Sequence, residues 1–297
     1  MTIVDVGGHQ LKLSNLDKVL FPSGFTKGEV IDYYARIAPV LVPHLEGRPL
    51  TLKRYPNGSM AGHFFEKNCP KHRPEWFTTA PVASSRNRGT IEYCVVDSVA
   101  GLVWVANLAS LELHPSLSLA PAVERPTMVV FDLDPGAPAG LPECREVALH
   151  LRDVFDHLDL RSVVKTSGSK GLQVYVPLNT PATYEGPGGT KGFALAVAQL
   201  LERQLPDLVV SNMAKDLRVG KVLVDWSQND EHKTTVSVYS LRAKERPTVS
   251  TPVSWDEVDE GGDLLRFEAG DALERVDRLG DLFRPALDIQ QELPRLA

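Results

Sequence analysis

The chain has 297 residues, of which 43% are hydrophobic, and a formal net charge of −6 at pH 7. This length suffices for one large domain or two closely packed subdomains, and the negative charge excludes a uniformly basic nucleic-acid coat protein. No run of eighteen apolar residues and no signal-peptide pattern is visible, so neither a membrane span nor export is predicted.

The first clear helix is predicted to begin at Thr26, whose hydroxyl can cap it while Glu29 completes a capping box. Its expected apolar face consists of Val30, Tyr34, Ile37 and Leu41. A second helix follows Pro142, with an apolar face of Val147, Leu151, Val154 and Leu158. A third is expected over residues 191–205, with an apolar face of Phe193, Val197, Leu200 and Leu201. Ser254 and Glu257 resemble another capping box near the end of the chain.

Apolar runs of strand length lie between these helices. Strands are expected near residues 93–97, 127–132, 162–166, 172–177, 208–211, 222–226 and 235–239. Their alternation with helices in the second half of the chain predicts an α+β fold, in which helices pack against a mixed central sheet.

Three aspartates each end an apolar run. Asp132 and Asp134 are two residues apart, so their side chains point to the same face of a strand that Pro135 and Gly136 terminate. Asp225 ends a later run. Three carboxylates of this kind suit Mg²⁺ or Mn²⁺, and two such ions are the usual apparatus of nucleotidyl transfer. The Asp-x-Asp-Pro-Gly pattern is also ordinary turn chemistry, which leaves a purely structural role open.

A small-residue loop at residues 166–171 favours the catalytic interpretation. It contains Ser167, Ser169 and Lys170 and leads into an alternating strand. Hydroxyls, backbone N–H groups and a cation in one loop are suited to a triphosphate. The spacing is not that of a Walker loop, and a strand follows where a helix would be required.

Taken in order, FDLDPG, TSGSKGLQVY and KVLVDWSQN closely resemble motifs of the primase-polymerase domain of bacterial ligase D and its stand-alone relatives in the archaeo-eukaryotic primase superfamily. The resemblance extends to LDKVLFP, KRYPNG, FFEKN, LELH and YSLR, in family order. It implies a primase-like catalytic core with an N-terminal α/β portion. Residues 1–297 would form a single domain, with a DNA-binding portion at 1–120 and the catalytic core and C-terminal helices at 121–297.

The resemblance implies a template-dependent nucleotidyltransferase that fills short gaps or ends in DNA during repair, including non-homologous end joining. It would favour ribonucleotides and use two Mn²⁺ or Mg²⁺ ions, with primase activity left open. The expected partners are gapped DNA or double-strand ends, nucleoside triphosphates, and a DNA ligase and the end-binding protein Ku acting in trans. A monomer in the cytoplasm, associated with the nucleoid and not with a membrane, is expected.

Residue roles also follow from the resemblance. Asp132, Asp134 and Asp225 would be the catalytic metal ligands. The implied nucleotide-binding residues are Lys53, His114, Ser167, Ser169, Lys170, Gln228 and Arg242. Lys18 and Lys27 would bind a downstream 5′-phosphate, Phe64 and Phe65 would stack on the template, and Arg54 would contact DNA. For the two phenylalanines, core packing is the alternative.

The chain departs from the family pattern at two places. Gln173 replaces the histidine usual in the second motif, and an amide can donate a hydrogen bond but cannot become a cation. The segment after His114, from Pro115 to Leu119, lacks the usual aromatic and basic residues, so we assign it no contact.

Two other functions compete with this interpretation. A haloacid-dehalogenase-type phosphohydrolase would use Asp132 as nucleophile, with Thr166 and Lys215 in supporting roles. The paired acidic motif of that family is missing, since Trp226 follows Asp225. A non-catalytic DNA-end binding module is disfavoured because all three carboxylates are present.

Cys69 and His72, with His63 upstream, raise the question of a zinc site, but a fourth ligand has no candidate in the sequence. The three cysteines are widely spaced, which argues against a disulfide framework and for a reducing cytosol.

Overall fold

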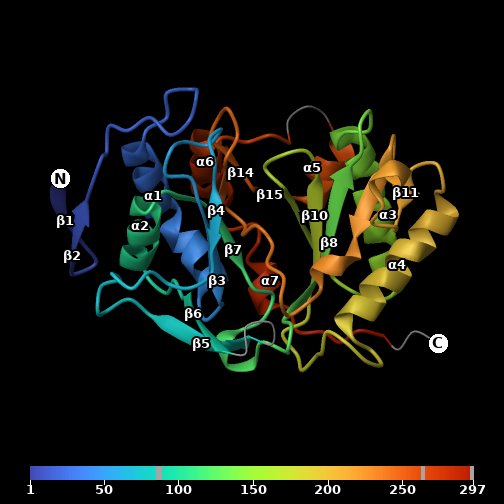
Figure 1. Ribbon diagram of the computed structural model, residues 1–297. Helices are drawn as coiled ribbons and strands as arrows, with labels where there is room; N and C mark the ends of the chain where they lie inside the picture. The colour runs from blue at the N-terminus through green and yellow to red at the C-terminus, as the bar shows by residue number, and fades with distance from the viewer. Residues whose placement is uncertain (85–88, 262–264, 295–297) are drawn as a thin grey trace. The chain divides into compact units, whose positions relative to one another are not determined.

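The computed structural model describes residues 1–84, 89–261 and 265–294, and the chain divides into two compact units (Figure 1). Unit 1 comprises Met1–Pro121, Thr234–Ser250 and Phe267–Asp281. Unit 2 comprises Ala122–Lys233, Thr251–Arg266 and Leu282–Ala297. The chain thus enters each unit more than once.

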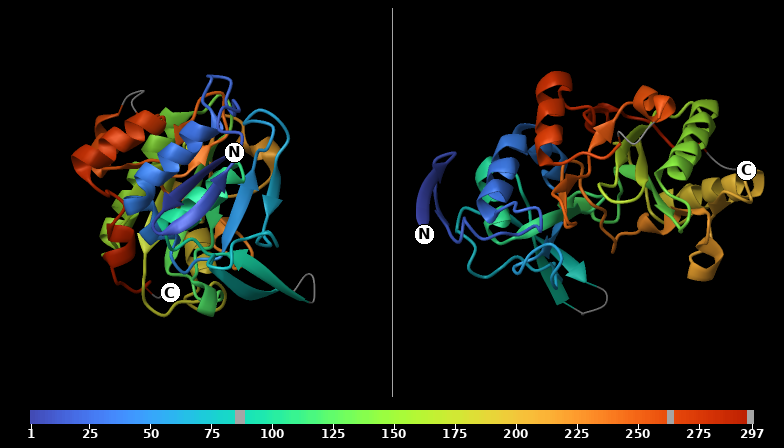
Figure 2. Two further views of the ribbon diagram at one scale, coloured as in Figure 1. Left: turned by 90° about the vertical axis from the view of Figure 1, so that its left-hand side faces the viewer. Right: turned by 90° about the horizontal axis from the view of Figure 1, so that it is seen from above.

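Unit 1 contains two small two-stranded sheets and one larger sheet. Its strands are β1 (Thr2–Val6), β2 (His9–Leu13), β3 (Leu50–Arg54), β4 (Phe64–Glu66), β5 (Thr79–Ser84), β6 (Gly89–Cys94), β7 (Ser110–Pro115), β13 (Leu241–Arg242) and β14 (Thr248–Val249). The larger sheet has the order β4-β3-β6-β5, and β7 also pairs with β3. Figure 2 shows the β5–β6 hairpin extending away from the rest of this unit. The helices are α1 (Lys27–Leu45), α2 (Val99–Asn107) and α6 (Ala269–Leu279).

The predicted first helix is confirmed as α1. The Thr26 hydroxyl accepts from the Glu29 N–H at 3.3 Å, and the Glu29 carboxylate accepts from the Thr26 N–H at 2.7 Å. The four apolar residues expected on one face are fully buried, and α1 packs beside α2. This face anchors α1 in the core of unit 1.

Unit 2 is built on a six-stranded sheet with the order β11-β12-β8-β10-β9-β15. The strands are β8 (Met128–Pro135), β9 (Val163–Thr166), β10 (Leu172–Pro177), β11 (Val209–Val210), β12 (Val222–Asp225) and β15 (Pro252–Val253). Only β11 and β12 pair in parallel, so the predicted mixed sheet is confirmed. The helices are α3 (Leu141–His157), α4 (Thr190–Gln204), α5 (Trp255–Glu260) and α7 (Pro285–Asp288), with 3-10 turns η2 (Lys215–Arg218) and η3 (Trp226–Gln228).

Helices α3 and α4 lie together on one face of this sheet (Figure 1). The Phe131 ring on β8 lies 5.2 Å from the Phe155 ring of α3 and 6.4 Å from the Phe193 ring of α4. Because side chains alternate along a strand, Asp132 and Asp134 point to the opposite face. Packing on the helical side therefore fixes the direction of both carboxylates.

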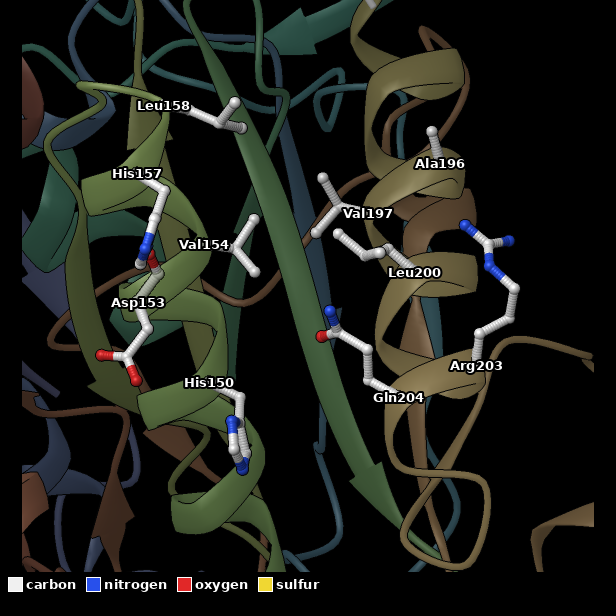
Figure 3. Close-up of a pocket in the computed structure, with 10 residues that line it drawn as sticks. All are labelled: His150, Asp153, Val154, His157, Leu158, Ala196, Val197, Leu200, Arg203 and Gln204. Carbon is white, nitrogen blue, oxygen red and sulfur yellow. The ribbon is translucent and has the colours of Figure 1, made fainter.

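Two details of the predicted helices are corrected. Val154, Leu158 and Leu200 were expected on buried faces, but they are only half-buried and line a groove between α3 and α4 (Figure 3). The buried position on α3 is taken by Phe155 instead of Val154. Figure 3 shows Val154 and Leu200 on facing sides of the groove.

The strand predictions fail at two places. Residues 235–239 form no strand, although Val236, Val238 and Tyr239 are buried. Their segment makes single hydrogen bonds, such as the one from the Ser237 N–H to the Leu113 carbonyl, instead of a ladder. The strand expected at 93–97 is β6, which ends at Cys94.

The free thiols of Cys69 and Cys94, far apart in sequence, lie close together: their sulfur atoms are 2.7 Å apart. The rings of His72 and His63 point to other neighbours, Trp104 and Tyr55 respectively. Within the described residues, no helix combines the length and apolar character needed to cross a membrane.

Candidate active site

A row of four polar side chains crosses the sheet of unit 2. The register pairs Asp225 of β12 with Asp132 of β8, Asp132 with Gln173 of β10, and Gln173 with Lys165 of β9. Directly opposed residues of neighbouring strands place their side chains on one face. Asp132 therefore lies between a carboxylate and an amide, and Asp134 follows it on the same face.

Gln173 connects Lys165 to Asp132. The Lys165 ammonium donates to Gln173 Oε1 at 2.5 Å, and the Tyr175 hydroxyl donates to the same oxygen at 3.2 Å. The amide oxygen of Gln173 already accepts these two hydrogen bonds. The Gln173 side chain therefore hydrogen-bonds to Asp132 through its N–H group. The glutamine at the position of the family histidine thus acts as a neutral donor to the central carboxylate.

The electrostatics of Asp132 indicate a site prepared for a cation. Burial, together with the charges of Asp225 and Asp134, raises the pKa of Asp132 to about 6, although the Gln173 hydrogen bond and Lys165 oppose the rise. Nearby like charges disfavour ionisation, and a divalent cation would remove that repulsion. The chemistry of these oxygen donors therefore suits a divalent metal ion.

Protein donors hold the other two carboxylates. Asp225 accepts from the Ser227 hydroxyl at 2.6 Å and from Gln228 Nε2 at 2.7 Å, and it caps η3. Asp134 Oδ2 lies 3.5 Å from Arg218 Nη1. In the described part of the chain, no three His, Cys, Asp or Glu side chains are arranged as a metal cage. Gln228, predicted as a nucleotide contact, thus lies against the Asp225 carboxylate.

The loop between β9 and β10 is folded around one hydroxyl. Ser167 Oγ accepts from the Ser169 N–H at 3.2 Å and from the Gly171 N–H at 3.1 Å. Gly168 has a φ of +65°, which favours glycine. Ser169 is half-buried and Lys170 is exposed. Ser167 therefore shapes the loop that presents these two side chains.

Lys53, His114 and Arg242, predicted separately as nucleotide contacts, converge in unit 1. All three surround the Glu112 carboxylate of β7. Glu112 Oε2 lies 3.4 Å from Lys53 Nζ, 3.0 Å from His114 Nε2 and 3.4 Å from Arg242 Nε. The sequence placed Glu112 in a family motif but gave it no role.

The predicted phosphate-binding lysines line one pocket of unit 1 together with Arg54. The Lys18 ammonium donates to the Pro56 carbonyl at 2.5 Å, and the Lys27 ammonium donates to the Ser14 carbonyl at 2.7 Å. Burial, followed by the charges of Lys18 and Arg54, lowers the pKa of Lys27 to about 8. Three cations in one pocket suit a phosphate group.

Phe64 and Phe65 are on the surface: they are 43% and 56% exposed, so core packing does not explain them. Each pairs with a cation across the β3–β4 register, Phe64 with Arg54 and Phe65 with Lys53. The cations lie 5.2 Å and 5.4 Å from the respective rings. The pair offers aromatic faces next to positive charge.

Comparisons with known proteins place the chain in a family. The family model described as LigD, primase-polymerase domain, matches residues 26–283. The chain belongs to this family. It is 43% identical over 279 residues to the multifunctional non-homologous end joining protein LigD of Mycolicibacterium smegmatis, a match that covers 93% of the chain and 36% of that protein. The bifunctional non-homologous end joining protein LigD of Bacillus subtilis is 31% identical over 273 residues, which are 91% of the chain and 43% of that protein.

A solved structure of the polymerase domain from Mycobacterium tuberculosis Ligase D in complex with DNA matches with a TM-score of 0.85 and 40% identity. The match covers 96% of the chain and 99% of the domain, which confirms the predicted primase-like fold. The chain spans about a third of the length of the mycobacterial relatives.

As a LigD primase-polymerase domain, the chain has the chemistry of a DNA-directed nucleotidyltransferase, which uses divalent metal ions. The family assignment also decides against the phosphohydrolase. The Thr166 hydroxyl, its proposed second motif, accepts from the Thr251 N–H inside the sheet.

Proposed function

We propose that the chain fills short gaps and processed ends in DNA during repair, with two Mn²⁺ or Mg²⁺ ions, and favours ribonucleotides and a downstream 5′-phosphate. The observation that carries this proposal is the row across unit 2, in which Asp132 lies opposite Asp225 with Asp134 on the same face. In a purely structural sheet, carboxylates placed this close together would only destabilise the fold, because their negative charges repel one another.

The carboxylates would divide the metal ligation. Asp132 and Asp134 would bind both ions, and Asp225 would bind the ion nearest the primer 3′-hydroxyl. When bound, the ions lower the pKa of that hydroxyl and neutralise charge on the α-phosphate. Gln173 and Gln228 would keep the carboxylates oriented through the hydrogen bonds that they donate.

The candidate nucleotide contacts form two groups, one within unit 2 and one within unit 1. Ser169 and Lys170 would contact the phosphates directly. Ser167 would contribute its hydroxyl and would also shape the loop that carries the other two residues. Lys53, Arg242 and His114 would form the second group. These assignments are supported by the charges of the basic side chains, by the hydrogen bonds of Ser167 and by the ion pairs of Lys53 and Arg242.

Lys18, Lys27 and Arg54 would bind the downstream strand, with the two lysines on its 5′-phosphate. Since the pKa of Lys27 is about 8, its ammonium is present at pH 7 and is lost as the pH rises. A phosphate monoester is already doubly charged above about pH 7, so its own charge stays constant.

We therefore expect the preference for a 5′-phosphate over a 5′-hydroxyl to fall about tenfold between pH 7 and pH 9.5. Bound phosphate stabilises the charged form of Lys27, so the midpoint of this fall should lie above pH 8. Fluorescence anisotropy with the two gapped duplexes measures this ratio. The Lys27→Arg variant serves as control, because arginine stays charged and its ratio should not vary with pH. A flat ratio in the unsubstituted protein would refute the assignment of Lys27.

Phe65 would stack on the template. Phe65→Ala should weaken binding of a single-stranded template overhang by about 1–3 kcal/mol, since one base-stacking platform is lost. The melting temperature should not change, because the ring is 56% exposed. Leu279→Ala on α6, which removes another exposed apolar side chain, is the matched control. Equal affinities of the two variants would assign Phe65 no role in template binding.

The remaining partners follow from the family. We propose that residues 1–297 act as one catalytic domain, a monomer in the cytoplasm at the nucleoid. A DNA ligase and Ku would act with it, either in trans or as further parts of a longer protein.

The experiment that tests the function is primer extension on a duplex with a short gap, with Mn²⁺ or Mg²⁺ and with ribo- or deoxynucleotides. Extension should be stronger with a downstream 5′-phosphate and with ribonucleotides. Absence of templated extension with either metal would contradict the proposal, and equal extension on both gaps would remove its 5′-phosphate part.

A further inference from the structure

Glu112 is a buried acid at the centre of a basic cluster in unit 1. Its side chain is 2% exposed, and it faces Lys53 directly across the β3–β7 register. Besides the three basic side chains, the Tyr55 hydroxyl at 3.0 Å and the Ala243 N–H at 3.2 Å donate to Oε1. Both carboxylate oxygens are thus held from several elements at once.

Three basic side chains share the Glu112 carboxylate. Burial opposes ionisation of Glu112, but the His114 hydrogen bond and the charges of Arg242 and Lys53 hold its pKa well below the usual range. Burial lowers the pKa of His114, although Glu112 opposes this. Basic side chains gathered in one half-buried cluster suit an anionic ligand.

Glu112 also sets the tautomer of His114. A carboxylate only accepts hydrogen bonds, so the 3.0 Å contact requires a proton on His114 Nε2. In the neutral ring Nδ1 is then the acceptor, which fixes what the ring can offer to a ligand. The Lys53 ammonium is held further by the Tyr55 and Phe65 rings, at 5.3 Å and 5.4 Å.

We propose that Glu112 is a positioning residue for nucleotide addition, which holds Lys53, His114 and Arg242 in the orientation in which they contact the incoming nucleoside triphosphate. This inference rests on the nucleotide-binding role proposed above for those three side chains. Glu112 acts through them, since a carboxylate would repel the phosphates. Without it, the three side chains must be ordered during binding, and ordering them costs affinity.

The test compares KM and kcat for the incoming nucleotide in primer extension. Glu112→Gln, which keeps the shape but removes the charge, should raise KM about 10- to 100-fold and change kcat less than about threefold. Glu112→Asp, which keeps the charge, should restore KM to within about fivefold of the unsubstituted value.

The matched control is Asp281→Asn in the same unit. Asp281 is also a carboxylate between a histidine and a tyrosine: it accepts from His44 at 2.9 Å and from the Tyr239 hydroxyl at 2.7 Å. Its substitution should leave KM unchanged even where it lowers the melting temperature. A folded Glu112→Gln variant with unchanged or lower KM would overturn the inference, as would an equal rise of KM in Asp281→Asn.

Lys53→Ala and Arg242→Ala separate this inference from the proposed function. If neither raises KM, the nucleotide-binding role itself fails, whatever Glu112→Gln does. If both raise KM and Glu112→Gln does not, only the positioning role fails.

A spectroscopic readout needs no variant at position 112 and so does not depend on its folding. Histidine ring ¹H–¹⁵N spectra, assigned with His114→Asn, should show the Nε2–H tautomer of His114 in the unsubstituted protein. Addition of a non-hydrolysable nucleoside triphosphate should shift the His114 signals. A predominant Nδ1–H tautomer, or no shift at saturating nucleotide, would contradict the proposal.

Discussion

Asp132→Asn should abolish nucleotide addition, with a loss of about 10³-fold or more, because Asp132 is one of the two carboxylates proposed to bind both metal ions. Removal of such a ligand costs several kcal/mol of transition-state stabilisation, and about 4 kcal/mol corresponds to that factor. Single-turnover extension of a gapped primer measures the loss. Binding of the gapped duplex should be retained, so that the defect is assigned to chemistry.

The same variant should be more stable than the unsubstituted protein when metal is removed with EDTA. The pKa of Asp132 is raised from 3.8 to about 6, so the folded state disfavours the carboxylate that the unfolded chain accepts. This cost is present above about pH 6 and absent below about pH 4. At pH 8 we expect the melting temperature of Asp132→Asn to be about 2–4 °C higher. A lower melting temperature at pH 8 would show that the negative charge of Asp132 does not destabilise the folded protein.

Gly171→Ala should destabilise the protein by about 2–4 kcal/mol and impair catalysis. A Cβ at position 171 would lie 1.9 Å from the Leu133 carbonyl oxygen, a backbone atom of β8 between Asp132 and Asp134. Either the strand or the loop must move, and both carry predicted site residues. Urea denaturation measures the stability, and primer extension measures the activity.

Gly192→Ala is the control for that substitution. Gly192 lies in α4, and a Cβ there would meet no atom within 4 Å, so alanine should stabilise the helix by about 0.5–1 kcal/mol. Equal stability of the two alanine variants would mean that the backbone around Gly171 can move to accommodate a Cβ.

The positions of the three aspartates at strand ends could be predicted from sequence because the information is local. Asp132 and Asp134 are two residues apart on a strand with a clear end, and Asp225 ends another apolar run. The partnership of Lys165 and Gln173 could not be found in this way. It depends on the register between β9 and β10, which no single strand specifies.

The same limit explains why the sequence predicted no role for Glu112. Its two-residue spacing from His114 indicates a common face, but its contact with Lys53 requires the pairing of β7 with β3. Helix α2 was not predicted because Ala100 to Ala106 are buried on all sides, which removes the helical period. The segment at 235–239 was mistaken for a strand because its valines alternate and are buried, whereas its backbone makes single hydrogen bonds instead of a ladder.

The most direct test of the proposed mechanism is a Mn²⁺ titration followed by electron paramagnetic resonance, with a primed gapped duplex and a non-hydrolysable nucleotide. Two bound Mn²⁺ ions per chain are expected in the unsubstituted protein, and at most one in Asp132→Asn. Retention of two ions in that variant would contradict the assignment of Asp132, Asp134 and Asp225 as the ligands of the catalytic metals.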